Sequence, residues 1–484
     1  MLSLRAALGD LVESCELVDG GARFGGSRVE VFRSPQLHFS AAIHSQLTVL
    51  WIGEGDDPLR ATQRSAPNPE AYRNFLEFEG VAVFLRQAEG GAQIEIARTT
   101  AGSCPLYVSA ENGVLTCSWR FEDAVLALAE RRPDVEACRL LLEHGTCQVR
   151  NTVIERVHAL WPGEAVAFDR DGLVFREITE AEAVVPGSLR DDARATDELM
   201  RIIETVLRPR IDKARSVVVE VSGGYDSSLV ALAASKVRRP LHSYGLVHGG
   251  AMGAQQRNRR QELISLCELS DAPHSSGDPG PLAGLEFEEC SLTANDDIFR
   301  MACARGVDLH PAQPFDLILT GIGGDELTGT DTFYRREWEV YGPSSLSTMV
   351  AAAGRCDMFM RRGIWVFQPL AHPHVVNFCR ALPEKIRARR TLPIIALARA
   401  GLSDGFLFPR FHEHYGNLVQ YEASQFDFEK ALGRTIVADY GIQDYGPLLA
   451  RAYEAGTGGF SYSLVAELWG YLKLDLVLKR YLTA

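Results

Sequence analysis

The sequence predicts an α/β protein of two domains. Residues 1–185 form an amino-terminal α+β domain on antiparallel sheet, and residues 195–484 form a carboxy-terminal doubly wound α/β domain. The first prediction follows from short runs of alternating polar and apolar residues before residue 180. The second follows from later strands that are apolar on both faces and separated by helical stretches. A chain of 484 residues is long enough for two or three separate cores.

Composition excludes several classes of protein. The chain is 46% apolar and 23% charged, which is typical of soluble globular proteins, and it has no apolar run of the ~18 residues that a membrane span needs. The first residues lack the pattern of a secretory signal. A net charge of -13 argues against broad nucleic-acid binding. The ten cysteines include no CxxC pair, so we expect free thiols and a cytoplasmic protein.

The first domain is expected to contain several hairpins. The runs VAVFLRQ (81–87), AQIEIAR (92–98), LYVSAENGVLTCSW (106–119) and EAVAFDRDGLVF (164–175) alternate with period two and are punctuated by turn residues. FEDAVLALAERR (121–132) predicts a helix. The charged, small-residue segment 178–195 is the best candidate for a linker.

The second domain is expected to begin with an amphipathic helix over residues 196–211. Its apolar face contains Leu199, Ile202, Ile203, Val206 and Leu207. SVVVEV (216–221), LHSYGLV (241–247) and FDLILTG (315–321) then predict parallel strands. Ligands of such sheets bind beyond the carboxyl ends of the strands, which directs attention to the loops after Val221 and Thr320.

The first of these loops has the composition of a phosphate site. Gly223 and Gly224 allow a tight turn with exposed backbone N–H groups, and a helix begins near Asp226. Hydroxyls of Ser222, Ser227 and Ser228 add donors. A carboxylate among phosphate donors implies a bridging Mg²⁺. The alternative is a strand-to-helix turn in which these side chains act only as caps.

The second loop repeats this pattern. Gly321, Gly323, Gly324, Asp325 and Glu326 follow an apolar strand. If the two strands are neighbours, Asp325 and Asp226 face one another across the phosphates and share Mg²⁺. The alternative is a glycine-rich turn with an exposed acidic pair. The Walker pattern GxxxxGK[ST] occurs nowhere in the chain.

Together the loops SGGYDSS and GIGGDE resemble those of the asparagine synthetase family, which includes β-lactam synthetases and lasso-peptide macrolactam cyclases. FEGVAVFL, ARTTAGSCPLYVS and LWPGEAVAFD are similar to its glutamine-amidotransferase domain, and FQPLAHPHVVNFCRALPEKIR to its carboxy-terminal segment. The resemblance implies an Ntn-hydrolase-like first domain and an ATP-pyrophosphatase second domain. It also implies ATP and Mg²⁺ as cofactors, with nucleotide held by Ser222, Gly223, Gly224, Asp226, Ser227, Ser228 and Gly321, and metal held by Asp226 and Asp325.

The sequence departs from that family at several positions. Glutamine-hydrolysing members have a cysteine directly after the initiator methionine, and here the residue is Leu2. We therefore expect a degenerate first domain that releases no ammonia. Ile322 stands where the family often has a glutamate or tyrosine. In FPRFHEHYG, Arg410 and His412 align with the family's R-x-K motif, so that His412 replaces the lysine.

Three further side chains are candidates in the second domain. Arg390 falls near the family's other pyrophosphate-binding lysine and would keep its charge. His372 and His374 are candidate bases by position alone. The catalytic candidates are therefore His412, Arg410 and Arg390. A surface location of the histidines and a solvated helix end at Arg390 are the alternatives.

The expected function is an AMP-forming amide or lactam synthetase that adenylates a carboxylate and joins it to an amine without hydrolysing glutamine. A lasso-type cyclase would act on a precursor peptide and have a protease or leader-binding partner. The same loops also fit a β-lactam synthetase-like cyclase, an ammonia-dependent asparagine synthetase or a non-catalytic subunit that binds ATP or a peptide. No nucleic-acid partner is expected.

Overall fold

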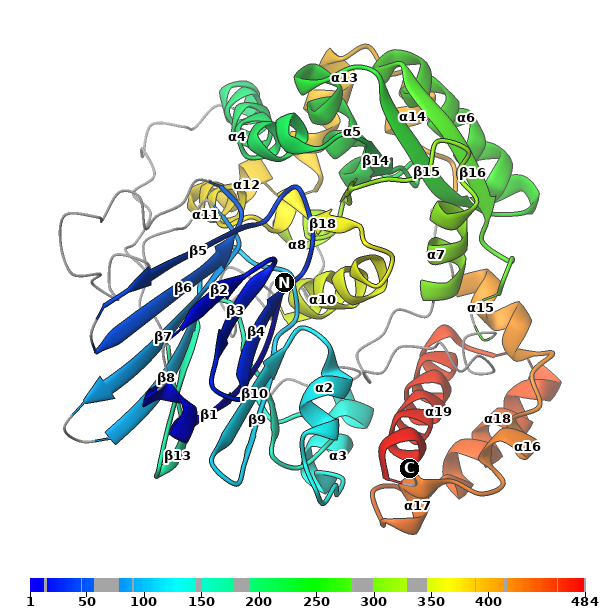
Figure 1. Ribbon diagram of the computed structural model, residues 1–484. Coiled ribbons are helices and arrows are strands. Elements are labelled where there is room, and N and C mark those ends of the chain that lie inside the picture. The colour runs from blue at the N-terminus through cyan, green and yellow to red at the C-terminus, as the bar shows by residue number, and fades with distance from the viewer. Residues whose placement is uncertain are drawn as a thin grey trace. The chain divides into compact units, whose positions relative to one another are not determined.

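The computed structural model describes residues 1–12, 15–44, 46–55, 78–88, 91–144, 150–177, 192–280, 282, 299–328, 346–387, 389–411, 416–458 and 460–482. The chain divides into two compact units (Figure 1). The first contains Met1–Asp134 and Val149–Val184, and the second contains Val135–Gln148 and Val185–Ala484. The second unit thus includes a short segment from within the predicted first domain.

The first unit is built on two antiparallel sheets. One has the order β11-β9-β10-β1-β4-β3-β2 and the other β13-β12-β8-β7-β6-β5. The strands of the first are β1 (Leu2–Ala7), β2 (Glu16–Val18), β3 (Gly21–Phe24), β4 (Ser27–Val31), β9 (Tyr107–Glu111), β10 (Val114–Ser118) and β11 (Val157–Ala159). Those of the second are β5 (His38–Ile43), β6 (Leu47–Gly53), β7 (Gly80–Ala88), β8 (Gly91–Arg98), β12 (Glu164–Asp169) and β13 (Gly172–Glu177).

Alternating side chains explain these sheets. Every second residue of β6 to β8 and β12 faces a core of Val49, Trp51, Ala82, Phe84, Ala97 and Ala165. Asn112 and Gly113, both with positive φ, turn the chain between β9 and β10. The helical elements are η1 (Leu8–Val12) and α2 (Phe121–Leu126). Helix α2 is shorter than the predicted helix 121–132, since the chain leaves the helical path after Ala127.

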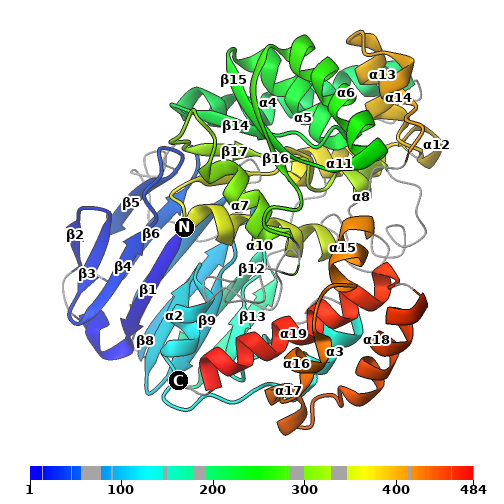
Figure 2. The same ribbon diagram turned by 90° about the vertical axis from the view of Figure 1, so that its right-hand side faces the viewer.

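The second unit contains a five-stranded parallel sheet of order β16-β15-β14-β17-β18. Strands β14 to β17 of this sheet are labelled in Figure 2. Its strands are β14 (Val217–Glu220), β15 (Leu241–Val247), β16 (Leu269–Ser275), β17 (Leu317–Leu319) and β18 (Trp365–Phe367). The central strands β14 and β17 are almost wholly buried and apolar. The predicted mixture of antiparallel and parallel sheet in one α/β chain is confirmed.

Helices cover both faces of this sheet. Helices α4 (Asp192–Lys213), α5 (Tyr225–Val237) and α13 (Thr391–Arg399) pack on one another, whereas α7 (Arg300–Asp308) packs on β15 and β16, and α10 (Leu346–Met360) on β18. Helix α4 contains the predicted helix 196–211 and extends beyond both of its ends. The other elements near the sheet are α6 (Gly250–Cys267), α8 (Gly324–Thr328), η4 (Pro369–Ala371), α11 (Pro373–Ala381), α12 (Glu384–Arg387) and α14 (Asp404–Leu407).

The end of the chain forms a helical cluster with a helix from much earlier in the sequence. It comprises α15 (Gly416–Ala423), α16 (Phe428–Leu432), α17 (Ile436–Asp439), α18 (Gly446–Gly458) and α19 (Tyr462–Leu482). Helix α3 (Val135–His144) packs on α19 and buries Ala137, Cys138 and Leu141. The Arg139 guanidinium donates to the carbonyls of Gly441 and Ile442 at 2.7 and 3.1 Å.

Candidate functional site

The two glycine loops lie side by side at the carboxyl ends of two central strands of the parallel sheet. Strands β14 and β17 are neighbours, and Val219 is in register with Leu319. A Cβ at Gly321 would come within 2.6 Å of the Ser227 nitrogen, and one at Gly324 within 2.3 Å of the Asp226 Cγ. Such distances are too short for any side chain, so the close approach of the two loops requires glycine at both positions.

The loop from Ser222 to Ser228 is held by its own hydroxyls. The Ser222 Oγ accepts a hydrogen bond from the Gly224 nitrogen at 3.1 Å and lies 3.0 Å from the Ser227 Oγ. The Ser228 Oγ donates to the Gly224 carbonyl at 2.6 Å. Gly223 has φ +91°, a conformation that favours glycine. Helix α5 begins directly afterwards, and no side chain caps its amino-terminal end.

A buried glutamine of α6 supports this loop from behind. The Gln256 amide nitrogen donates to the carbonyls of Ser222 and Leu246 at 2.8 and 2.9 Å. Its amide oxygen accepts from the His248 nitrogen at 2.9 Å. One side chain therefore fixes the ends of β14 and β15 together. Sequence reasoning missed Gln256, since it lies in a polar stretch, AQQRNRRQE, that reads as a solvated helix.

Arg390 joins the two loops. Its Nη1 lies 2.8 and 3.0 Å from the two carboxylate oxygens of Asp226, and its Nη2 forms an ion pair with Asp325. The Nη1 also lies 3.3 Å from the Thr328 hydroxyl, and the Arg390 main-chain nitrogen donates to the Thr328 carbonyl at 2.9 Å. Three predicted site residues therefore meet at one point, and Arg390 is in contact with carboxylates rather than being a solvated helix end.

The segment that contains Arg410 is anchored next to this loop. The Tyr225 hydroxyl donates to the Leu407 carbonyl, and the Arg259 Nε donates to the Phe406 carbonyl at 3.0 Å. The Gln255 amide of α6 bonds to both main-chain groups of Phe411 at 2.9 Å. The Arg410 side chain is exposed and lies over the Phe411 ring. His412 lies outside the described residues.

The other positions considered for proton transfer are His372 and His374, at the start of α11, and Ile322 in the second loop. His372 is buried and caps α11, where its Nδ1 accepts from the His374 nitrogen at 3.2 Å. His374 stacks near His372, with ring centroids 5.2 Å apart. The Ile322 nitrogen contacts the Thr320 hydroxyl, and its side chain offers no titratable group.

The donors present fit a phosphate-bound magnesium ion. Mg²⁺ in nucleotide sites is usually held by one or two carboxylates and by substrate phosphates, with water completing the octahedron. Asp226 and Asp325 already converge on one cation, the Arg390 guanidinium. In the described part of the chain, no group of three or more His, Cys, Asp or Glu side chains is arranged to hold a metal without such a substrate.

In the first unit, the side chain at position 2 has no reactive group. Leu2 is fully buried in β1, between β4 and β10. Nearby, the buried Glu79 carboxylate accepts from the nitrogens of Ser103 and Cys104 at 3.1 and 2.7 Å, and it pairs with Arg98. Burial raises the pKa of the Cys104 thiol to about 11, so that this thiol is neutral and unreactive near neutral pH.

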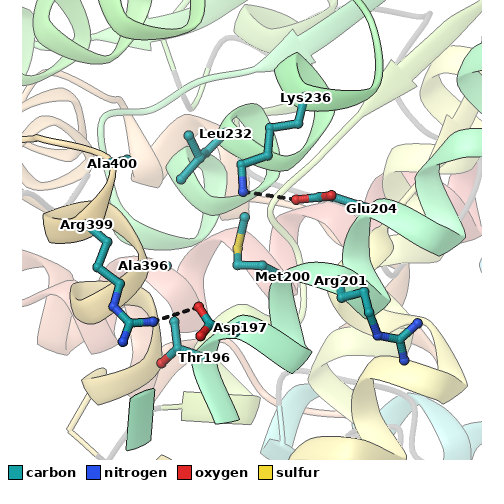
Figure 3. Close-up of a pocket in the computed structure, with 10 residues that line it drawn as sticks. All are labelled: Thr196, Asp197, Met200, Arg201, Glu204, Leu232, Lys236, Ala396, Arg399 and Ala400. Atoms are coloured by element: carbon teal, nitrogen blue, oxygen red, sulfur yellow. Dashed lines mark hydrogen bonds and ion pairs between the residues drawn. The ribbon is translucent and has the colours of Figure 1, made fainter. Parts of the chain in front are cut away.

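A separate pocket of about 300 Å³ lies among α4, α5 and α13 (Figure 3). Met200, Leu232 and Ala396 supply apolar lining. Its charged residues are paired: Arg399 with Asp197 at 2.6 Å and Lys236 with Glu204 at 3.0 Å. Arg201 pairs with Glu198, which lies next to the lining residues. None of the residues that line this pocket belongs to either glycine loop.

Comparisons with known proteins assign no family. No family model and no curated protein matches the sequence. Among solved structures, a glutamine phosphoribosylpyrophosphate amidotransferase from B. subtilis, complexed with ADP and GMP, matches at 12% identity and a TM-score of 0.21. That match covers 54% of this chain and 64% of the other. A structure described as the allosteric regulatory enzyme of purine biosynthesis matches at 10% identity and a TM-score of 0.21, over 56% and 74% of the two chains. TM-scores of this size support no functional conclusion.

Among the described residues, no helix has both the length and the apolar character needed to cross a membrane.

Proposed function

We propose that the second unit is an ATP-dependent, AMP-forming amide synthetase. The observation that supports it best is the meeting of Asp226 and Asp325 on Arg390, across two glycine loops at the carboxyl ends of adjacent parallel strands. Two carboxylates and a guanidinium beside an uncapped helix start are suited to a polyphosphate with its metal ion.

In this proposal each part of the chain has a defined task. The backbone N–H groups at Gly223 and Gly224 and the serine hydroxyls bind phosphate oxygens. Asp226 and Asp325 would hold Mg²⁺, which would supply positive charge to neutralise the phosphates. Arg390 donates to the pyrophosphate oxygens. Gln256 keeps the loop in shape and touches no substrate.

The proposed reaction has two steps. A carboxylate oxygen of the substrate attacks the α-phosphorus, the bond from that phosphorus to the bridging oxygen breaks, and pyrophosphate leaves with the electron pair. An amine nitrogen then attacks the acyl carbon, AMP leaves, and the amine loses one proton. The residue three before Asp325 offers no base, because Ile322 cannot accept a proton.

Exchange of labelled pyrophosphate into ATP tests this proposal. It should be measured with Mg²⁺ over a set of small carboxylic acids, amino acids and candidate peptides. Wild-type protein should exchange with at least one of them, and Asp226→Asn should lower that rate by at least about 100-fold (about 2.7 kcal/mol or more), since it removes one of the two carboxylates proposed to hold Mg²⁺ at the phosphates.

Asp212→Asn is the matched control, because Asp212 is an exposed aspartate of α4 and should exchange like wild type. Exchange by Asp226→Asn at the wild-type rate would contradict the proposed metal site.

A non-catalytic ATP-binding subunit is the second candidate. Ile322 favours it, since this side chain supplies no base at the second loop. Tight binding of ATP without exchange for any carboxylate would support this candidate and reject the synthetase.

A further inference from the structure

Arg390 stands where the metal ion would have to bind. The same guanidinium contacts Asp226 at 2.8 and 3.0 Å and forms an ion pair with Asp325. A divalent cation held by both carboxylates would occupy the space that the guanidinium fills, and the two positive groups would repel one another strongly at that distance.

The Arg390 backbone is fixed while its side chain has freedom to turn. Its nitrogen donates to the Thr328 carbonyl at 2.9 Å, and its carbonyl accepts from the Ile394 nitrogen at 3.0 Å, at the start of α13. The side chain is partly accessible, with 23% of its surface exposed, and the Asp325 side chain is 53% exposed. The guanidinium can therefore leave the carboxylates by side-chain rotation without disturbing either loop.

A polyphosphate would provide the guanidinium with an equivalent partner. Arginine donates bidentate hydrogen bonds to phosphate oxygens just as it does to carboxylate oxygens. A ligand bound along the loop at Gly223 and Gly224 would bring such oxygens to the helix start beside Asp226. The two carboxylates would then be free for a cation that arrives with the phosphates.

We infer that Arg390 acts as an internal counter-cation that excludes divalent metal from the nucleotide-free site, and that metal binds only together with nucleotide. The second half of this inference rests on the proposed nucleotide site, whereas the first half concerns the chain alone. The consequence is that metal does not bind to this site before nucleotide. Free Mg²⁺ does not occupy the site, and the arginine moves from carboxylate to phosphate when metal and nucleotide enter.

Binding of Mn²⁺, used as a paramagnetic substitute for Mg²⁺, tests the exclusion directly. Electron paramagnetic resonance would count bound Mn²⁺ for wild type, Arg390→Gln and Arg389→Gln, all without nucleotide. We expect at least about tenfold tighter Mn²⁺ binding by Arg390→Gln than by wild type, because removal of the guanidinium leaves two adjacent carboxylates without their cation. Arg389 is exposed and also has a φ of 58°, so Arg389→Gln is a matched control and should behave like wild type.

Wild-type protein alone supplies an independent measurement. Its Mn²⁺ affinity should rise at least about tenfold when a non-hydrolysable ATP analogue is present. Equally tight Mn²⁺ binding by wild type with and without the analogue would overturn the inference, as would unchanged binding by a folded Arg390→Gln. Failure of wild type to bind the analogue at all would reject the proposed nucleotide site, yet it would leave the nucleotide-free comparison of Arg390→Gln with wild type decisive for the exclusion.

Discussion

Gly324 sets how closely the two acidic loops approach one another. Its position would place a Cβ 2.3 Å from the Cγ of Asp226, whose carboxylate is already held by Arg390. Gly324→Ala should therefore displace Asp226 and lower the free energy of unfolding by about 1–3 kcal/mol. Chemical denaturation measures this loss, and the same variant should bind the ATP analogue with Mn²⁺ more weakly than wild type.

Gly470→Ala makes the same chemical change in the middle of α19, where no described atom outside the neighbouring stretch of the same helix lies within 4 Å of the new Cβ. It should raise stability by about 1 kcal/mol, since alanine is the better helix former. If both variants shift stability in the same direction, contact between the loops is not what Gly324 provides.

The residue types within the two loops predicted the site well, whereas the sequence around the loops did not reveal the residues that support them. Glycines and carboxylates after apolar strands indicated Asp226 and Asp325 as partners, and the structure places both on Arg390. Gln256 could not be predicted, because its role depends on the distance between β14 and β15. A sequence pattern shows which residue types are present but not which carbonyls they reach.

At the scale of single elements, His310 ties the end of α7 to β15. Its Nε2 donates to the Ser243 carbonyl at 3.2 Å, and its Nδ1 accepts from the Ala312 nitrogen at 3.1 Å. Both nitrogens are used by the neutral ring, and burial lowers the pKa of His310. The groups that face the His310 ring are Phe315, His242 and Asp271. Burial also lowers the pKa of His242. The Asp271 carboxylate acts in the opposite direction and raises the pKa of His310.

This arrangement predicts an acid-sensitive contact. The unfolded chain takes up a proton near the ordinary histidine pKa of about 6.5, whereas folded His310 takes it up only at lower pH. Stability from this contact is therefore present above that pKa and lost as pH falls below it. His310→Asn should be less stable than wild type at pH ~7.5 but should lose less stability on acidification to pH ~5.5, a window that brackets the ordinary histidine pKa.

Thermal unfolding at the two pH values measures the difference. His44→Asn, at an exposed position in the first unit, should retain the wild-type dependence. An unchanged loss on acidification in His310→Asn would show that other groups cause it.

Elements with strong periodicity were predicted well, and short buried ones were not. The hairpins β7–β8, β9–β10 and β12–β13 and strands β14, β15 and β17 lie where alternation and apolar runs place them, whereas β1 to β6 were not located from the sequence. Strand β18 has only three residues, in IWVFQP, and becomes a strand through pairing with β17. Tertiary pairing of this kind leaves no local signal.

At the scale of the whole chain, α3 is the feature that the domain prediction did not include. Its apolar face of Ala137, Cys138 and Leu141 is readable as a helix, but its partner α19 lies more than 300 residues later in the sequence. Periodicity shows that a helix has an apolar face and not which helix covers it. The prediction placed residues 135–144 within 1–185, and in the structure they are part of the second compact unit.

Arg139 tests this assignment. Its guanidinium donates to the carbonyls of Gly441 and Ile442, beside α17. Arg139→Ala should lower stability by about 1.5–3 kcal/mol, the range for hydrogen bonds that involve a charged group. Arg194→Ala, which truncates an exposed arginine on α4, should be within about 0.5 kcal/mol of wild type. Equal stability of the two variants in denaturant titrations would show that Arg139 does not stabilise this contact.

The docking of α3 also determines what a break in the chain would do. The polypeptide crosses between the two units three times, at residues 134–135, 148–149 and 184–185. Cleavage of the backbone at the last crossing alone would leave α3 on the amino-terminal fragment, still packed on α19 of the other fragment. The two pieces would then remain together as a non-covalent pair, with α3 acting as a built-in tether, and halves encoded by separate genes could assemble by the same contact.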